Sequence, residues 1–183
     1  HAMDSLVRRQ DWMFLLSDKV YRYNLPFSEK EETEKYLVSV PIKNNREIKI
    51  PSGFISGQNV YNLFSDLTIG YHDSLDFKKL PIPFACVASN LVDGKEVIQD
   101  CGVLPLAMRA SMAIPGAFAP VRQDSMVLVD GGISNNFPVD IAKAMGADII
   151  IGVDVQAELK NASGLESVMG ILDQMTSFLG IQK

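Results

Sequence analysis

The sequence predicts an α/β protein with helices on both faces of a parallel sheet. Two apolar runs, 126–129 and 148–155, flank a helix that Pro138 opens and Gly146 ends. A strand, a helix and a strand of these lengths form a unit whose strands are parallel neighbours with a right-handed crossover. Both runs are apolar throughout, which is typical of strands that helices cover on both faces.

Hydrophobic periodicity and turn residues predict the other elements. Asn44 and Asn45 suit a tight turn between two alternating strands, and Asp93 and Gly94 join a second pair. A capping box that begins at Ser163 starts a C-terminal helix. In chain order we expect a helix over 4–16, strands over 36–42 and 46–50, a helix over 57–67, strands over 84–92 and 95–99, a helix over 104–113 and a helix over 165–179.

Composition restricts the class of protein. We interpret residues 1–3 (His-Ala-Met) as a cloning remnant and 4–183 as a single domain, which is long enough to bury a core. The net charge of −5 argues against nucleic acid as a partner. Cys86 and Cys101 have neither the number of a disulfide framework nor metal-ligand spacing. We therefore expect no metal and no cofactor, while the compartment stays open.

The candidate catalytic residue is Asp130. It follows the apolar run 126–129, and ligands of open α/β sheets bind at the carboxyl ends of parallel strands. Gly131 and Gly132 let the backbone turn sharply beside a substrate. Asp-Gly is also a leading turn dipeptide, and a hairpin fully explains Asp93 and its glycine. Because Asp130 enters a strand-to-helix loop instead, we predict that its carboxylate accepts a proton from a nucleophile.

The sequence offers no convincing nucleophile. The exposed serine of an acyl hydrolase lies in a Gly-x-Ser-x-Gly string, and the chain has none. Ser56 is interpreted as an N-terminal helix cap, and Ser111 as a site of close helix packing. His72, the histidine left once the remnant is set aside, is predicted to lie in a solvated loop.

Five segments stand out in chain order: 54–58 (Phe-Ile-Ser-Gly-Gln), 76–84 (Asp-Phe-Lys-Lys-Leu-Pro-Ile-Pro-Phe), 109–116 (Arg-Ala-Ser-Met-Ala-Ile-Pro-Gly), 129–138 (Val-Asp-Gly-Gly-Ile-Ser-Asn-Asn-Phe-Pro) and 145–148 (Met-Gly-Ala-Asp). In this order they resemble successive blocks of bacterial patatin-like phospholipases. The resemblance implies a three-layer α/β/α fold and a Ser-Asp dyad that cleaves fatty acyl esters without a histidine. The aspartate of the Asp-Gly-Gly block, Asp130 here, is the base of that dyad.

The family's glycine-rich oxyanion loop and serine elbow precede these blocks, and neither occurs here. We expect the chain to be the C-terminal part of a patatin domain, inactive by itself, from a parent that hydrolyses lipid acyl esters. The alternative is a non-catalytic docking or assembly module. The parent is expected to be bacterial, in the cytoplasm or associated with the outer membrane and periplasm, with a membrane surface as a further partner.

The incomplete fold also predicts association. Loss of the strand that leads to the elbow would leave the strand over 126–129 with unpaired backbone groups, and such an edge is a template for pairing. We expect the chain to form a homo-oligomer or to associate with the missing N-terminal segment.

Overall fold

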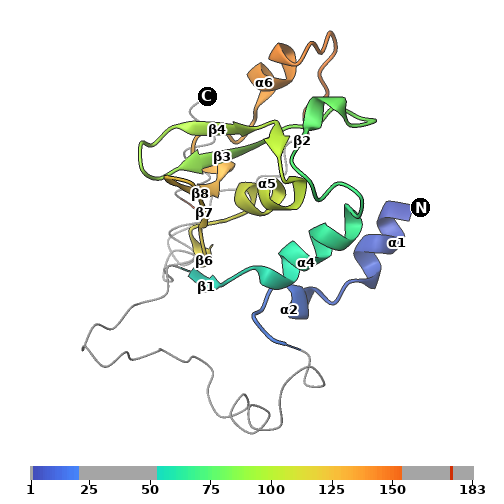
Figure 1. Cartoon of the computed structure of the whole chain (residues 1–183), viewed down its shortest axis with the longest axis vertical. Coiled ribbons are helices and arrows are strands. Elements are labelled where there is room, and N and C mark those ends of the chain that lie inside the picture. The colour runs from blue at the N-terminus through green and yellow to red at the C-terminus, as the bar shows by residue number, and fades with distance from the viewer. Residues whose placement is uncertain (1, 21–52, 154–173, 175–183) are drawn as a thin grey trace, which may run out of the picture.

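A four-stranded antiparallel sheet lies at the centre of the described structure. The structure is a computed structural model, and it describes residues 2–20, 53–153 and 174. The strand order is β4–β3–β8–β7, and each pairing is antiparallel (Figure 1). The strands are β3 (Cys86–Asn90), β4 (Glu96–Gln99), β7 (Val121–Gln123) and β8 (Met126–Asp130).

The β3–β4 hairpin confirms the strand pair predicted around Asp93. Its register pairs Cys86 with Gln99 and Ser89 with Glu96. Gly94 has a φ of 72°, which an L side chain rarely adopts, and its N–H donates to the Asn90 carbonyl at 2.8 Å. The turn therefore lies at the position that the Asp-Gly dipeptide predicted.

Two further strand pairs connect the segments around the sheet. β1 (Gly53–Ile55) pairs in parallel with β6 (Gly116–Phe118). β2 (Leu75–Asp76) pairs antiparallel with β5 (Cys101–Gly102), next to the 3-10 turn η2 (Phe77–Lys79). Parallel pairing among the described residues is thus confined to β1 and β6, outside the central sheet.

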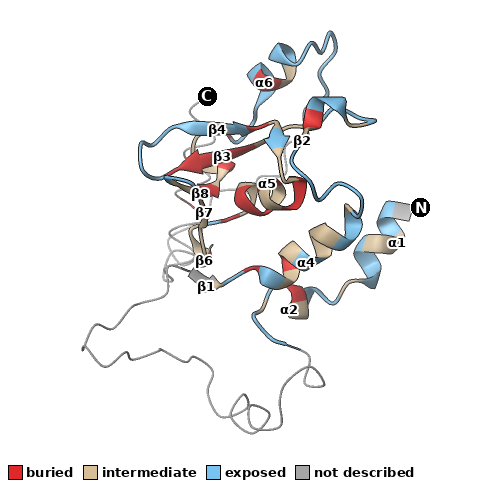
Figure 2. Cartoon of the chain, viewed as in Figure 1, coloured by how far each residue is buried: buried red, intermediate tan, exposed pale blue. Residues whose placement is uncertain are grey.

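Helix α5 (Leu104–Ser111) forms the core with the sheet. Ala110 is fully buried, and it packs with Ala88 of β3 and Leu128 of β8. Figure 2 shows buried segments in α5 and in β3. The small alanines bring helix and sheet close together, so little volume remains for substitution. Helix α4 (Gln58–Leu67) forms where its periodicity predicted it. Helix α6 (Val139–Ala144) forms between Pro138, its N-cap, and Gly146, as those two residues predicted.

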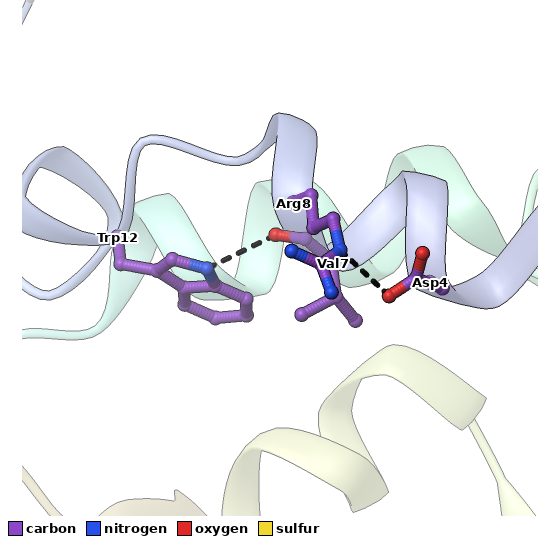
Figure 3. Close-up of polar contacts among 4 residues, drawn as sticks. All are labelled: Asp4, Val7, Arg8 and Trp12. Carbon is purple, nitrogen blue, oxygen red and sulfur yellow. Dashed lines mark hydrogen bonds and ion pairs between the residues drawn. The ribbon is translucent and has the colours of Figure 1, made fainter.

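The predicted N-terminal helix is divided in two. α1 (Ala2–Arg9) and α2 (Trp12–Leu15) meet at Asp11, whose side chain accepts the Phe14 N–H bond at 3.0 Å as an N-cap. The Trp12 indole N–H donates to the Val7 carbonyl at 3.1 Å across the joint (Figure 3). Asp11 is the local sequence signal for a second helix start, and the prediction of one helix over 4–16 did not take it into account.

The prediction of a parallel strand over 148–155 is wrong for its described part. Residues 148–153 form neither helix nor strand, and Ile149 and Ile151 are 85% and 88% exposed. β3 and β7 occupy the two sides of β8, so no edge of β8 is left for a parallel neighbour. For the same reason, the expectation that 126–129 has an unpaired edge is wrong. Figure 1 shows α6 standing away from the sheet instead of covering it.

Several predicted elements lie outside the described residues. They are the strands over 36–42 and 46–50 and all of the helix over 165–179 apart from Gln174. In the parts of the chain that the structure does describe, no helix is both long and apolar enough to cross a bilayer.

Candidate active site

Asp130 is the last residue of β8, and its backbone is bonded on both sides. Its N–H donates to the Ala113 carbonyl at 3.0 Å, and its carbonyl accepts from the Ser89 hydroxyl at 3.0 Å. The register pairs it with Ala88 of β3. The predicted position at a strand end is therefore confirmed. The argument from parallel strands is wrong, because β8 is antiparallel to both of its neighbours.

The Asp130 carboxylate begins the 3-10 turn η3 (Gly131–Ile133). One oxygen, Oδ1, accepts the Gly132 N–H bond at 2.7 Å. Burial raises the pKa of Asp130 from its ordinary value of 3.8, and the Gly132 hydrogen bond opposes part of that rise. A carboxylate with a raised pKa is a stronger base, so its environment favours proton acceptance.

Gly131 and Gly132 are required here because a side chain at either position would clash with neighbouring atoms, and not because their backbone has a positive φ. A Cβ on the buried Gly131 would lie 2.3 Å from the Val87 carbonyl oxygen in β3. A Cβ on Gly132 would lie 2.9 Å from Asn136 Oδ1 and 3.0 Å from Asp130 Oδ1. The turn therefore lies directly against the sheet, and its backbone holds the carboxylate.

The hydroxyl groups of Ser89 and Ser134 stabilise the η3 turn. Ser89 is 3% exposed, and its Oγ lies 2.7 Å from Ser134 Oγ as well as donating to Asp130. The Gly131 carbonyl accepts the N–H bonds of Ser134 and Asn135 at 3.1 and 2.8 Å. Sequence reasoning missed these residues. Ser134 and Asn135 lay within the singled-out loop, whereas Ser89 is 41 residues away and gave no signal.

The Asn135 amide connects this loop to two other elements. It is 5% exposed, and its Nδ2 donates to Glu96 of β4 at 3.0 Å and to Asp140 of α6 at 3.1 Å. A buried amide donating to two carboxylates is a charge-assisted contact. The loop is thus fixed to the hairpin at one end and to α6 at the other.

The side chains weighed as nucleophile or partner lie elsewhere. Ser56 Oγ donates to Asp18 at 2.6 Å and accepts the Gln58 N–H bond at 3.3 Å, although Gly57 is the N-cap of α4. Ser111 is the last residue of α5, and its side chain forms a hydrogen bond with the Cys86 thiol. Burial raises the pKa of Cys86 to about 11. His72 is exposed as predicted, with its ring Nε2 2.7 Å from the Ser65 carbonyl oxygen. In the described structure, none of these side chains hydrogen-bonds to Asp130.

The described residues show no group of three or more His, Cys, Asp or Glu side chains placed to hold a metal ion. Two cavities, of about 200 and 400 Å³, are lined by residues other than Asp130. The chemistry that the described loop itself offers is therefore that of one raised-pKa carboxylate.

Comparison with known proteins identifies the family. A profile of the Patatin-like phospholipase family matches residues 11–143. An uncharacterized NTE family protein of Mycobacterium tuberculosis (strain ATCC 25618 / H37Rv) is 42% identical over 78 residues, covering 43% of this chain and 22% of that protein. Patatin-like phospholipase domain-containing protein 7 of Rattus norvegicus is 30% identical over 106 residues, covering 57% of this chain and 7% of that protein.

The profile matches more than half of the 183 residues, so the chain belongs to the patatin-like phospholipase family. The predicted family is confirmed, the mycobacterial relatives support its bacterial branch, and the family is one of lipid hydrolases. The mixture of helices and strands in the chain is consistent with the predicted α/β class. The chain spans no more than 22% of the length of the relatives named above.

Proposed function

We propose that Asp130 is the general base of a Ser-Asp dyad in a lipid acyl hydrolase. The observation that carries the proposal is its carboxylate, which lies at a strand end, with a raised pKa and one oxygen fixed by the Gly132 N–H at 2.7 Å. The 183 residues contain no Gly-x-Ser-x-Gly string, so the proposed nucleophilic serine lies outside them. The same holds for the oxyanion donors that acyl transfer needs.

The geometry suggests that the two carboxylate oxygens have different roles, one structural and one in proton transfer. Oδ1 is committed to Gly132, and the structure assigns Oδ2 no donor among the described residues. In the proposed reaction, Oδ2 accepts the serine proton as the serine oxygen bonds to the acyl carbon. Asp130 then returns that proton to the departing alcohol. Water repeats the sequence to release the fatty acid, so the base ends in its starting form.

The substrate class is a proposal that rests on membership of the family, and the location is a further proposal. We propose a fatty acyl ester of a lipid, met at a membrane surface, in a bacterial parent that is cytoplasmic or associated with the outer membrane and periplasm. The chain by itself is proposed to lack activity. A short-chain nitrophenyl ester tests this, because turnover by the repurified 183-residue chain that disappears in Asp130→Asn would contradict it.

The decisive experiment compares two Asp-Gly aspartates in the longer parent protein. Asp130→Asn keeps the shape but removes the proton acceptor, so esterase activity should fall by about 10²–10⁴-fold. Asp93→Asn is the matched control, since Asp93 Oδ1 accepts the Lys95 N–H bond at 3.1 Å in the same local way. Wild-type activity in the Asp130 variant would end the proposal. A parent inactive on all acyl esters would favour the docking module.

Self-association is a separate proposal about partners. Ile149, Ile151 and Val153 are 85%, 88% and 73% exposed on an apolar run, and an apolar surface of this kind favours association. We propose that the isolated chain forms a dimer or larger species through this run, unless the family's missing N-terminal segment covers it. Light scattering of the wild type and of Ile151→Lys tests it. A wild type that is monomeric at all concentrations would refute it.

A further inference from the structure

A second site is built around Arg109, away from the Asp130 loop. A cavity of about 200 Å³ is lined by the start of α4, by α5 and by residues 119–121 after β6. The residues that matter here are Gly57, the N-cap of α4, Gln58 and Tyr61 of α4, and Arg109 of α5. None of them bonds to the Asp130 loop, so the inference is independent of the proposed hydrolysis.

Arg109 is a buried cation with spare donors. It is 3% exposed, and its Nη2 donates to the carbonyls of Ser56 and Ala119 at 2.7 and 2.9 Å. Its Nη1 is buried and has no hydrogen-bond partner among the described residues. A buried donor of a charged group that lacks an acceptor is destabilising, so its retention calls for a reason.

The neighbours of the guanidinium do not provide the missing acceptor. Arg109 Cζ lies over the Phe118 ring, 5.0 Å from its centroid, and an aromatic ring in this position offers no lone pair to the Nη1 N–H bonds. The Asp18 carboxylate accepts from the Ser56 N–H at 2.8 Å and from its hydroxyl at 2.6 Å. Burial lowers the pKa of Arg109, and the charge of Asp18 opposes that effect without a direct hydrogen bond.

The start of α4 adds positive potential to the same cavity. α4 has ten residues, and its N-cap Gly57 makes no side-chain cap bond. Helix N-termini attract anions through their free N–H groups and the helix dipole. A Cβ on Gly57 would lie 2.2 Å from Arg109 Nε, so glycine is what allows the guanidinium to lie against the helix start.

We propose that this cavity binds a phosphate group. Nη2 is already committed to two carbonyls, so the two-pronged grip by which arginine holds a planar carboxylate is not open. The other possible donors around the cavity come from separate elements: Arg109, the Tyr61 hydroxyl and the first turn of α4 beyond the Gln58 N–H, which Ser56 Oγ accepts at 3.3 Å. The Gln58 amide has a second hydrogen beside the one that it donates to Asn62 Oδ1 at 2.9 Å. Donors in several directions suit a tetrahedral oxyanion. The group comes either from free phosphate or from the phosphodiester head of a lipid.

The test is to titrate the 183-residue chain with phosphate compounds at low salt and to monitor binding by calorimetry and by the NMR chemical shifts of backbone amides. The probes are inorganic phosphate and the phosphodiester glycerophosphoglycerol. We expect saturable binding that moves the amides of Gly57 and Gln58. Arg109→Gln should weaken it at least tenfold, whereas Arg9→Gln, an exposed arginine that does not line the cavity, should leave it unchanged. Tighter binding of inorganic phosphate would indicate the free ion, and tighter binding of the diester would indicate a lipid head.

A charge series keeps the test decisive if Arg109→Gln does not fold. Gln58→Glu places a negative charge at the exposed rim, and Asp18→Asn removes one while keeping an acceptor for Ser56. The first should weaken phosphate binding by about 2–5-fold and the second should strengthen it by a similar factor. Failure of both probes to saturate would overturn the proposal. So would an affinity that Arg109→Gln leaves unchanged, or one that neither Gln58→Glu nor Asp18→Asn changes.

Discussion

Two Asp-Gly turns follow strands of the central sheet, β3 and β8. They share the same local hydrogen bond but differ in how far the aspartate is buried. Asp93 Oδ1 accepts the Lys95 N–H bond at 3.1 Å, and Asp130 Oδ1 accepts the Gly132 N–H bond at 2.7 Å. Each bond spans two residues, as in an Asx turn. Asp93 is exposed, however, whereas Asp130 is partly buried and has a raised pKa. The comparison teaches that the dipeptide shapes the turn, while its surroundings determine its chemistry.

The glycines show the same contrast. Gly94 has a φ of 72° and nothing within 4 Å of an added Cβ, so it is required by backbone conformation. Gly131 would place its Cβ 2.3 Å from the Val87 carbonyl oxygen, so it is required by space. One turn is determined locally, and the other depends on a strand more than forty residues earlier in the chain.

The largest effect on stability should separate these two glycines. Gly131→Ala should destabilise the chain by about 3 kcal/mol, because the backbone of β3 or of the turn must move. Gly94→Ala should cost about 1 kcal/mol, from the positive φ alone. Urea denaturation of both variants measures the difference. Equal losses would show that the Asp130 turn does not lie against β3 as described.

The next effect concerns the hydroxyl beneath the Asp130 turn. Ser89→Ala removes the donor to the Asp130 carbonyl and the contact with Ser134, and it should destabilise by about 1–2 kcal/mol. Ser125→Ala, an exposed serine between β7 and β8, should change stability by no more than about 0.5 kcal/mol. Chemical denaturation of the pair is the measurement. A harmless Ser89→Ala would mean that β3 does not support the turn.

The smallest effect is a pH-dependent gain in stability. Because burial raises the pKa of Asp130 above 3.8, the folded chain holds this proton more tightly than the unfolded chain. The stabilising contribution is complete below the unfolded pKa and is lost as pH rises through the folded pKa. Asp130→Asn should therefore be slightly more stable than wild type at pH 7 and equal to it at pH 3.

Asp93→Asn is the control for this experiment, because an amide oxygen can still accept the Lys95 N–H bond. Urea midpoints from pH 3 to 8 provide the data. An equal gain in both variants at pH 7 would show that the two turns have the same environment, which would remove the basis of the comparison.

The sequence alone determined the features that depend on neighbouring residues. Periodicity located α4 and α5, turn chemistry located the β3–β4 hairpin, and the ordered segments around Asp130 identified the family. Each of these features depends on local propensity or on a contiguous pattern, which can be read from neighbouring residues alone.

Only the tertiary structure decided which strands pair and what surrounds the aspartate. The apolar run over 148–155 has the composition of a buried strand, yet its described part is exposed, because β3 and β7 already occupy both sides of β8. Ser89 gave no signal because its role depends on a contact across 41 residues. Long-range pairing determines burial, and burial determines the pKa of Asp130, so a local pattern could locate this carboxylate but not its chemistry.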